Sequence, residues 1–407
     1  MNHRKYFVSL HKNRQKMKIL FLVYHGFEEC SGISKKIHYQ VKGLRENGHD
    51  VRLCHYTIRA DGHRCRFVDD DIIQDYGTGF IAALRQRVGY GCIYDYCVRE
   101  GIEFVYARCF QNANPWLIRF FKKLKQAGIH AVTEIPTYPY DAEFVGFPFM
   151  TRMNLKVDQT FRHRLYSQQD AVVTFSDAEE IFGQRTIRIS NGVDFDSIPL
   201  HNYQPSDSQP SALHLIGVAE VHYWHGFDRL IAGLGEYYRT SALSPQPSAF
   251  KEVFFHIVGG VAPSEMYDSM HAPGFHELME KYQIRDKVIF HGQLFGQALD
   301  DVFSQCQFAV GSLARHRSGI TNIKTLKNRE YATRGIPFIY SEQDTDFDHQ
   351  PYVLKAPADE SPVNIQQIID FVNVHQFNPA DIRQTVENLS WRKQMQLVVD
   401  TISFGNG

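Results

Sequence analysis

The chain has 407 residues, of which 43% are hydrophobic and 22% are charged, and its formal net charge at pH 7 is −1. This length exceeds what one ordinary hydrophobic core holds and fits two domains of roughly 150–200 residues each. A net charge near zero excludes a general basic field, so we expect no nucleic-acid partner.

The cysteines and the amino terminus indicate a cytoplasmic protein. Seven cysteines lie at irregular spacing without a C-x-x-C pair, a pattern that predicts free thiols in a reducing compartment. No apolar run reaches the ~18–20 residues that span a bilayer. Residues 1–16 form a basic extension without the apolar segment of a secretory signal. We interpret it as a disordered leader or as sequence before a true start at Met17, with a weak membrane-surface anchor as the alternative.

From residue 17 to residue 200 the pattern predicts a Rossmann-like domain. Lys18–Tyr24 is a continuous apolar run, as expected for a strand buried on both faces. A helical apolar pattern follows from Ile33 to Leu44, and His49–Cys54 is the next strand, which completes a βαβ unit. Further strands are expected at 104–106, 130–133, 171–175 and 185–190.

After a polar linker at 201–211, the α/β alternation restarts over residues 212–385, which predicts a second Rossmann-like domain. Residues 386–407 are expected to form a terminal helix. The fold class predicted is therefore α/β, with two Rossmann-like doubly wound domains facing a cleft. Ligands of such domains bind outside the carboxyl ends of the strands, so the cleft is the expected site.

The strongest chemical signal lies between Gly311 and Pro337, where a strand, a polar loop and a helix follow one another. The loop leads into a helix amino terminus, whose unpaired N–H groups and dipole suit a diphosphate. Lys327 and Glu330 are three residues apart and share a helix face. The cation suits phosphate charge and the carboxylate suits ribose hydroxyls, although an exposed ion pair is the alternative. Three cations add donors nearby: His316, Arg317 and Lys324.

The segment Arg329–Pro337 (REYATRGIP) resembles the E-A-x-A-x-G-x-P signature of GT-B glycosyltransferases of the group 1, family 4 type. Further segments are similar to that family in the same order, and the resemblance covers about Lys18 to Ser403. They are the N-G-V-D loop at Ser190–Asp194, the helix start at His225–Ile231, the strand ends at Val258–Gly260 and Val288–Gly292, and Leu389–Trp391 at the start of the terminal helix.

The resemblance implies that residues 17–200 form the acceptor-side domain, that residues 212–385 bind a nucleotide-diphosphate-sugar donor, and that the helix at 386–407 crosses back to the first domain. It also implies that Glu330 holds the ribose of that donor. Asn322 stands where the family has a second glutamate near the donor sugar. Glu220 and His225 stand where the family favours Arg and Lys for the diphosphate. We therefore expect Lys327 to act with Glu330 in catalysis.

The donor-binding residues expected beside this pair are Gly32, His225, Gly259, Arg317, Asn322 and Arg329. Arg317 and Lys327 are expected to supply the phosphate charge, helped by His225. Gly32 follows the first strand, where glycine allows close backbone approach to a phosphate or sugar, and a plain turn is the alternative. We expect no metal and no separate cofactor, because the acidic runs Asp69–Asp71 and Asp344–Asp346 do not lie in a pattern suited to a metal-dependent fold.

Two segments of the first domain are interpreted as surfaces for partners. The proline- and tyrosine-rich loop after the strand at 130–133 offers Glu134, Tyr138, Asp141 and Glu143 to a saccharide or lipid-linked saccharide acceptor, or else is a packed structural loop. The basic helix Pro115–Lys125 has an apolar face suited to an anionic membrane surface, with an ordinary outer helix as the alternative.

The function predicted is glycosyl transfer from a nucleotide-sugar to such an acceptor, with retention of configuration and in surface polysaccharide biosynthesis. The resemblance implies retention, because a donor phosphate oxygen can then take the acceptor proton and no separate protein base is needed. The expected location is the cytoplasm, with a peripheral contact at the inner face of the membrane left open. Two alternatives stay open: a non-catalytic GT-B-like subunit that binds a nucleotide-sugar or a partner, and a sugar-nucleotide epimerase.

Overall fold

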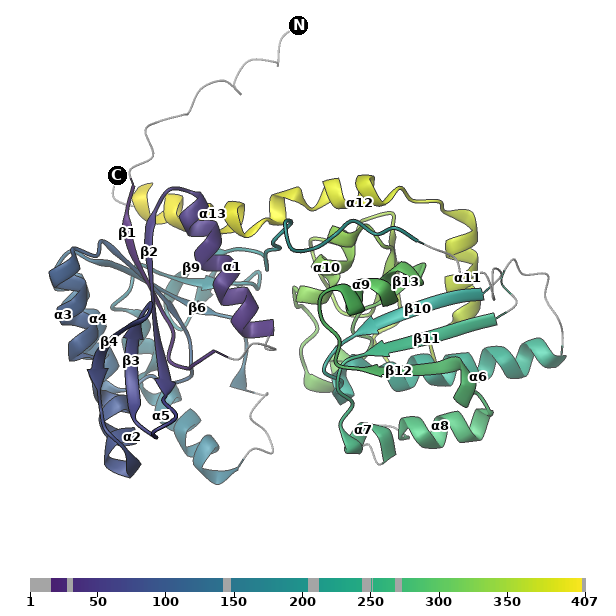
Figure 1. The fold of residues 1–407 in the computed structure, drawn as a ribbon, viewed down its shortest axis with the longest axis horizontal. Coiled ribbons are helices and arrows are strands. Elements are labelled where there is room, and N and C mark those ends of the chain that lie inside the picture. The colour runs from purple at the N-terminus through teal and green to yellow at the C-terminus, as the bar shows by residue number, and fades with distance from the viewer. Residues whose placement is uncertain are drawn as a thin grey trace, which may run out of the picture. The chain divides into compact units, whose positions relative to one another are not determined.

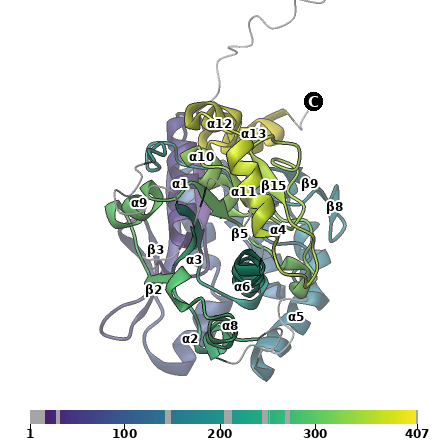
Figure 2. The same ribbon diagram turned by 90° about the vertical axis from the view of Figure 1, so that its right-hand side faces the viewer.

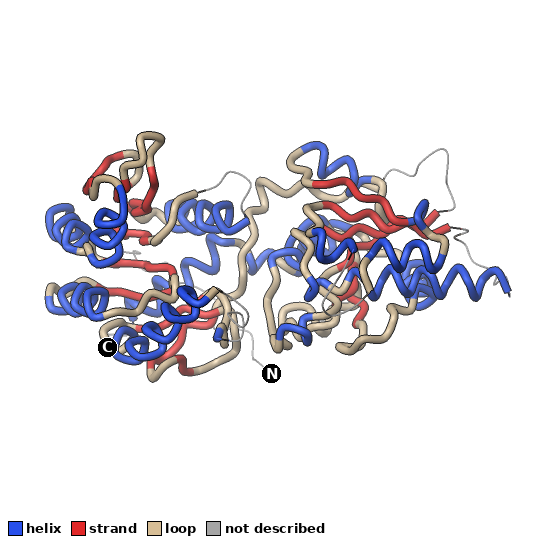
Figure 3. Tube along the Cα trace, turned by 90° about the horizontal axis from the view of Figure 1, so that it is seen from below, coloured by secondary structure: helices blue, strands red, loops and turns tan. Residues whose placement is uncertain are grey.

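The computed structural model describes residues 16–27, 32–141, 148–203, 212–243, 250, 252–267 and 273–404. The chain divides into two compact units. Unit 1 comprises Met1–Pro136, Phe147–Arg188 and Met395–Gly407, and unit 2 comprises Thr137–Gly146 and Ile189–Gln394. In each unit the strands form a layer with helices packed against it (Figure 3).

Unit 1 is built on a nine-stranded sheet in the order β4-β3-β2-β1-β5-β6-β7-β9-β8. β1, β2, β5, β6, β7 and β9 run parallel, and the remaining strands pair antiparallel at the two edges. Its strands are β1 (Lys18–Leu22), β2 (Asp50–Ile58), β3 (Arg64–Val68), β4 (Asp71–Asp75), β5 (Phe104–Arg108), β6 (His130–Ile135), β7 (Ala171–Thr174), β8 (Glu180–Ile181) and β9 (Gln184–Arg188). In β1, all residues from Ile19 to Leu22 are fully buried, as the continuous apolar run predicts.

The helices of unit 1 connect and cover these strands (Figure 1). They are α1 (Gly32–Glu46), α2 (Gly79–Val88), α3 (Gly91–Glu100), α4 (Pro115–Gln126), α5 (Phe149–Tyr166) and α13 (Trp391–Phe404), the last of which belongs to unit 1 from Met395 on. α1 follows the β1 strand directly in the order β1-α1-β2, and β1 and β2 pair parallel. The predicted βαβ unit is therefore confirmed.

The structure decides between the two interpretations of helix α4. Asn114 caps it by accepting a hydrogen bond from the Leu117 N–H at 2.9 Å, and Pro115 occupies the first turn. Its apolar face is buried inside unit 1, where Phe120 packs against Tyr90 with ring centroids 5.9 Å apart. This face is therefore not available to a membrane surface, and α4 is an ordinary outer helix.

Unit 2 is built on a six-stranded parallel sheet in the order β12-β11-β10-β13-β14-β15. The strands are β10 (Ala212–Val218), β11 (Glu252–Val258), β12 (Val288–Gly292), β13 (Phe308–Val310), β14 (Phe338–Tyr340) and β15 (Val353–Lys355). The first three strands extend the sheet in one direction and the last three in the other. The order therefore reverses between β10 and β13, which makes this pair the topological switch point of a doubly wound sheet.

The helices of unit 2 cover both faces of its sheet, and two hydrophobic clusters lie on either side of it. One cluster joins Leu230 and Ile368 to Phe255 of the sheet, and the other joins Val302 and Tyr331 to Phe338. α6 and α8 pack against each other (Figure 2). The helices are α6 (Phe227–Leu243), α7 (Pro263–Tyr267), α8 (Phe275–Tyr282), α9 (Gln297–Ser304), α10 (Leu326–Arg334), α11 (Ile365–Val374) and α12 (Pro379–Thr385), with short 3-10 turns η2 (Tyr223–His225), η3 (Arg285–Lys287), η4 (Arg315–Ser318) and η5 (Glu387–Leu389).

The division between the units falls after Arg188, whereas the sequence analysis drew it at residue 200. Backbone bonds explain why the N-G-V-D loop belongs with unit 2. Val193 N–H donates to the Leu389 carbonyl at 2.8 Å, and Trp391 N–H donates to the Val193 carbonyl at 3.1 Å. A Cβ on Gly192 would lie 2.4 Å from the Trp391 ring, so the loop needs glycine to pack against the start of α13.

Candidate functional site

The carboxyl ends of β10 and β13 in unit 2 form the candidate site. Ligands of open α/β sheets bind at such a switch point. One hydroxyl joins the two strand ends: Tyr331 Oη accepts a hydrogen bond from Val218 N–H at 3.1 Å and donates to the Val310 carbonyl at 3.0 Å. Tyr331 lies on α10, beside Glu330, so the predicted signature helix lies against the switch point.

Two glycines allow the backbones to pack closely at these strand ends. A Cβ on Gly311, directly after β13, would lie 2.8 Å from Asn328 Oδ1. Gly259, after β11, has φ +125°, and a Cβ there would lie 1.8 Å from the Ala219 carbonyl oxygen. Close packing of its neighbours is thus enough to require glycine at 259, and its donor-binding role stays a prediction.

Buried polar atoms without a hydrogen-bond partner among the described residues gather around this point. Glu342 is 2% exposed and neither of its carboxyl oxygens has a partner, and Ser312 and Asn328 are fully buried. Leaving such a group unsatisfied costs about 1–3 kcal/mol, and buried polar groups in native proteins are nearly always hydrogen-bonded. A cluster of them indicates a place that a polar ligand completes. We call these residues the polar cluster: Ser312, Thr325, Lys327, Asn328, Ser341 and Glu342.

The polar cluster comes from three segments that end at the same edge of the sheet. Ser312 follows β13, and Ser341 and Glu342 follow β14. Thr325 is the N-cap residue of α10, and its hydroxyl makes no capping bond. The first N–H groups of a helix lack partners within the helix and carry partial positive charge. The start of α10 therefore offers backbone donors to an anion beside the side chains of the cluster.

Lys327 and Glu342 are the ionisable members of the polar cluster. Burial, and then the neighbouring cation of Arg315, lower the pKa of Lys327 to about 7. Burial raises the pKa of Glu342 to about 7. The Lys327 ammonium nitrogen itself is inaccessible to solvent, although other parts of the residue are half-buried. Both groups therefore titrate near neutral pH, as groups in functional sites often do.

These two pKa values predict that an anionic ligand of the polar cluster binds less tightly as the pH rises. Below about pH 7 the Lys327 amine is charged and the Glu342 carboxyl is neutral, and above it the amine is neutral and the carboxyl is charged. The net charge of the pair thus falls from positive to negative, which disfavours a diphosphate. We expect the affinity for a nucleoside diphosphate to fall about tenfold or more from about pH 6 to about pH 8, measured by calorimetry. A flat profile in wild type, or the same slope in Lys327→Met, would contradict this.

Glu330 lies one helical turn from Lys327 on α10, and its side chain is 28% exposed. Its carboxylate forms an ion pair with Arg334 at 2.9 Å, and Arg334 also pairs with Asp300 at 2.7 Å. Because one carboxylate oxygen can accept more than one hydrogen bond, this pair leaves Glu330 suited to ribose hydroxyls. Its role in donor binding stays a prediction.

Arg317 does not provide the free phosphate-binding cation that the sequence analysis expected. Its side chain is 3% exposed, and its guanidinium forms ion pairs with Asp228 at 2.8 Å and with Glu360. Glu360 also accepts a hydrogen bond from His316 at 2.7 Å. The charge of Arg317 is thus balanced by two carboxylates that lie far from it in sequence.

The expectation that His225 acts as a phosphate-binding cation is also wrong. Its side chain is buried, and its Nδ1 accepts a hydrogen bond from His222 N–H at 2.9 Å, so it shapes the turn after β10. Burial lowers the pKa of His225 well below its usual value, and the cations of Lys327 and Arg315 lower it further. The imidazole is therefore uncharged at neutral pH.

Arg329 has a structural position rather than the donor-facing one expected. It is fully buried and forms ion pairs with Asp344 at 2.6 Å and with Asp346. The same guanidinium donates to Ser190 Oγ at 2.9 Å and to the Asn191 carbonyl at 3.1 Å. Arg329 therefore ties α10 to two loops of unit 2.

The predicted donor-binding roles of Gly32 and Asn322 stay predictions. Gly32 is the first residue of α1, and a Cβ there would meet nothing within 4 Å among the described residues, so packing does not require glycine. Asn322 pairs in an isolated parallel bridge with Gln343. Asn322 is the position at which the resemblance leads one to expect a glutamate. The bridge places it beside Gln343, the residue that follows Glu342.

Glu134, expected to face an acceptor, is instead fully buried at the end of β6. Its carboxylate pairs with Arg108 at 2.8 Å and Lys36 at 3.1 Å, and it accepts a hydrogen bond from Tyr106 Oη at 2.7 Å. Although burial would raise the pKa of Glu134, Lys36 and Arg108 lower it to about 2. The group is an internal ion cluster of unit 1 and is not available to an acceptor.

The other three acceptor-side residues keep their role only as a prediction. Tyr138 and Asp141 are half-buried, and nothing in the structure tests their role. Glu143 lies outside the described residues.

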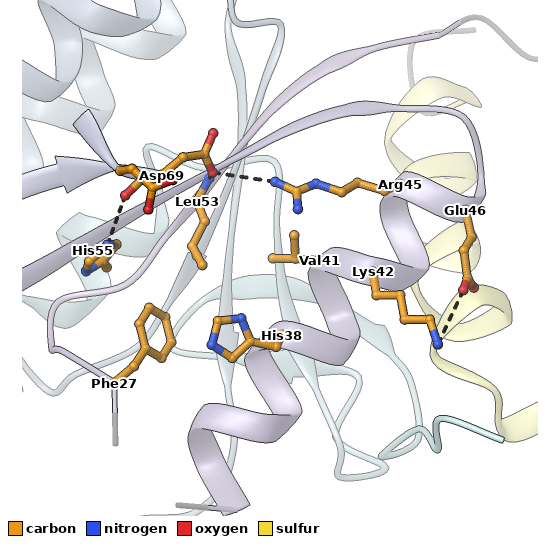
Figure 4. A pocket seen from close by; sticks show the side chains of 10 residues that line it. Phe27, His38, Val41, Lys42, Arg45, Glu46, Leu53, His55 and Asp69 are labelled. Carbon is orange, nitrogen blue, oxygen red and sulfur yellow. Dashed lines mark hydrogen bonds and ion pairs between the residues drawn. The ribbon is translucent and has the colours of Figure 1, made fainter. Parts of the chain in front are cut away.

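A pocket of about 730 Å³ in unit 1 lies between α1 and β2 (Figure 4). Its rings lie close together, with Phe27 4.7 Å from His38 and 5.3 Å from His55 between centroids. The charged groups of its walls pair with one another, since Arg45 contacts Asp69 at 3.5 Å and Lys42 contacts Glu46 at 3.8 Å. The charged side chains of this pocket thus already have partners, whereas polar atoms of the polar cluster have none among the described residues. We therefore favour the polar cluster as the site.

Of the polar cluster, sequence reasoning identified only Lys327, and it also missed Arg315. Ser341 and Glu342 follow β14, at the edge of the sheet where ligands bind, and this position is the signal that could have found them. Arg315 lies on η4, with its guanidinium 5.6 Å from the centre of the Trp224 ring. Its effect on the pKa of both Lys327 and Glu342 places its charge beside the pair.

In the described part of the chain, no group of three or more His, Cys, Asp and Glu side chains is arranged to hold a metal ion. None of the helices in the described ranges combines the length and apolar character that crossing a membrane requires.

Comparison with known proteins identifies the architecture. The sequence matches no protein-family model and no curated protein. Among solved structures, sucrose-phosphate synthase from Thermosynechococcus elongatus is 16% identical, with a TM-score of 0.57 over 96% of this chain and 98% of that one. Trehalose-6-phosphate synthase OtsA is 10% identical, with a TM-score of 0.57 over 95% and 99%. The pneumococcal O-GlcNAc transferase GtfA is 10% identical, with a TM-score of 0.52 over 96% and 99%. This chain therefore has the GT-B fold of glycosyltransferases.

Proposed function

We propose that the chain is a glycosyltransferase that takes its sugar from a nucleotide-diphosphate-sugar held at the polar cluster of unit 2. The observation that carries this proposal is the group of buried, unpartnered polar atoms at the β10–β13 switch point, beside the start of α10. Two structures of the same fold support it. GtfA was solved with UDP and GlcNAc, and an E. coli trehalose-6-phosphate structure was solved with UDP-2-fluoro glucose.

In this proposal the leaving diphosphate develops negative charge, and preorganised donors stabilise it. Lys327 supplies one donor, which becomes charged as the anion binds, and Arg315 and the first N–H groups of α10 supply others. Glu330 accepts the ribose hydroxyls. The carboxyl group of Glu342 and the hydroxyl groups of Ser312 and Ser341 suit the hydroxyls of the donor sugar, because they can both donate and accept hydrogen bonds when Glu342 is protonated.

We further propose that transfer retains the anomeric configuration, with a donor phosphate oxygen taking the acceptor proton, so that no separate protein base is required. The acceptor proposed is a saccharide or lipid-linked saccharide of a surface polysaccharide, and the proposed location is the cytoplasm. A nucleotide-sugar-binding subunit without turnover is the second candidate. It is favoured by the absence of a carboxylate at Asn322 and of a free cation at Arg317.

The test is a nucleotide-release assay over a panel of uridine and guanosine diphosphate sugars, with and without saccharide acceptors. Release that depends on an acceptor, and that Lys327→Met slows by about 10²–10³-fold, is the expected result. Isomerised donor without release would indicate an epimerase instead. Binding of the donor without either product would indicate the non-catalytic subunit. Absence of donor binding over the whole panel would overturn the proposal.

A further inference from the structure

Two neighbouring helices of unit 1 expose an unusual number of large apolar side chains. On α2, Phe80 is 84% exposed and Ile81 is 65% exposed. On α5, Phe149 is 71% exposed and Met150 is 69% exposed. We call the whole set the α2–α5 face: Phe80, Ile81, Leu84, Phe149, Met150, Met153 and Val157. Apolar groups gathered in this way on a soluble surface mark an interaction site.

The two helices are joined where these residues lie. Arg87, in the last turn of α2, donates a hydrogen bond to Asn154 Oδ1 of α5 at 2.7 Å. The buried residues of α5 are Asp158, Leu165 and Tyr166, so its first nine residues, 149–157, contain none. Both helices lie at the lower end of unit 1 in Figure 1. Four large apolar residues in the first half of α5 are therefore exposed: Phe149, Met150, Met153 and Val157.

The exposed charges on these helices have one sign. α2 has no acidic residue, and the single acidic residue of α5, Asp158, is 1% exposed and accepts a hydrogen bond from Ala113 N–H at 2.9 Å. The exposed basic residues beside the apolar ones are Arg85 and Arg87 of α2 and Arg152 and Lys156 of α5. A pair of helices that combines exposed apolar groups with cations, and that has no exposed carboxylate of its own, is complementary to an apolar layer beneath anionic groups.

We propose that the α2–α5 face docks onto an anionic membrane surface. Phe80, Ile81, Phe149 and Met150 enter the boundary between headgroups and acyl chains, while the arginine and lysine side chains stay at the level of the lipid phosphates. A second copy of the chain fits this face less well. A twofold interface would set the same cations opposite one another without carboxylates to balance them. The surface is separate from the polar cluster, so this inference does not depend on the proposed reaction.

The test measures co-sedimentation of the full chain with vesicles of phosphatidylcholine alone and with vesicles that also contain phosphatidylglycerol. We expect binding to the anionic vesicles that weakens as salt is added. Phe80→Ser with Ile81→Ser should reduce that binding at least about tenfold, because the inserted apolar area is lost. Arg85→Gln with Arg152→Gln should remove most of the preference for anionic vesicles.

Val374→Ser is the matched control, because Val374 is 74% exposed on α11 of unit 2, and it should bind like wild type. Unchanged melting temperature and nucleotide-sugar binding would show that the variants are folded. The inference is overturned if wild type does not sediment with anionic vesicles, or if Phe80→Ser with Ile81→Ser sediments as wild type does. A dimer seen by light scattering would also overturn the inference, if Phe80→Ser with Ile81→Ser abolishes that dimer and wild type does not bind vesicles. The α2–α5 face would then be a contact between two copies of the chain.

Discussion

Replacing Lys327 with methionine should lower kcat/KM for the nucleotide-sugar by about 10²–10³-fold, the loss typical of one preorganised donor to developing negative charge. The Lys327 ammonium nitrogen is buried and has no hydrogen-bond partner among the described residues. Methionine keeps the length and volume of the side chain but removes the donor and its charge. The measurement is steady-state kinetics of nucleotide release with saturating acceptor.

The same variant should keep or gain stability, because it removes an unsatisfied buried donor. This separates a functional lysine from a structural one: activity falls while the free energy of unfolding in urea does not. Lys281→Met, at an exposed lysine of α8, serves as the control and should change neither quantity. Unchanged kcat/KM in Lys327→Met would exclude Lys327 from the reaction, and a large loss of stability would give it a structural role.

Replacing Arg329 with methionine should lower the free energy of unfolding by about 3–5 kcal/mol, because removing one partner of a buried ion pair leaves the other uncompensated. Asp344 is fully buried and Asp346 is 20% exposed on its side chain, so two carboxylates would lose their cation. Ser190 would also lose a donor. Urea unfolding followed by far-ultraviolet circular dichroism measures the change.

The comparison for Arg329 is Arg285→Met. Arg285 pairs with Glu280 at 2.7 Å at the surface, where its side chain is 64% exposed, and such pairs contribute about 0–1 kcal/mol. If Arg329→Met were as mild as Arg285→Met, or if it removed donor binding at unchanged stability, Arg329 would be a donor-binding residue as its place in the signature implies.

Local sequence patterns predicted the elements well because those patterns come from burial along one segment. The apolar run at Lys18–Tyr24 gave a strand buried on both faces, and the loop and helix between Gly311 and Pro337 lie at the carboxyl edge of the second sheet. The doubly wound fold followed from the alternation of such segments. Gly335 ends α10 with φ +82°, and a Cβ there would lie 2.3 Å from the Pro379 carbonyl oxygen, so the glycine of the signature also has a packing reason.

Local patterns could not predict the ion pairs of the candidate site residues, because the partners in those pairs are distant in sequence. The cations expected at the diphosphate were chosen by their position near α10, but charge balance depends on the whole fold. Arg317 is neutralised by Asp228, which lies 89 residues away, and Arg329 by two carboxylates of the loop after β14. Glu134 looked like a loop carboxylate, yet Lys36 of α1 and Arg108 of β5 enclose it. No spacing rule within one segment predicts such contacts.

A crystal structure of the protein with a nucleotide-sugar bound would test the central claim most directly. The account predicts that the diphosphate accepts hydrogen bonds from Lys327 Nζ and from the first N–H groups of α10, and that Glu342 and Ser312 gain ligand partners. A donor bound elsewhere, with those polar atoms still unpaired, would contradict it.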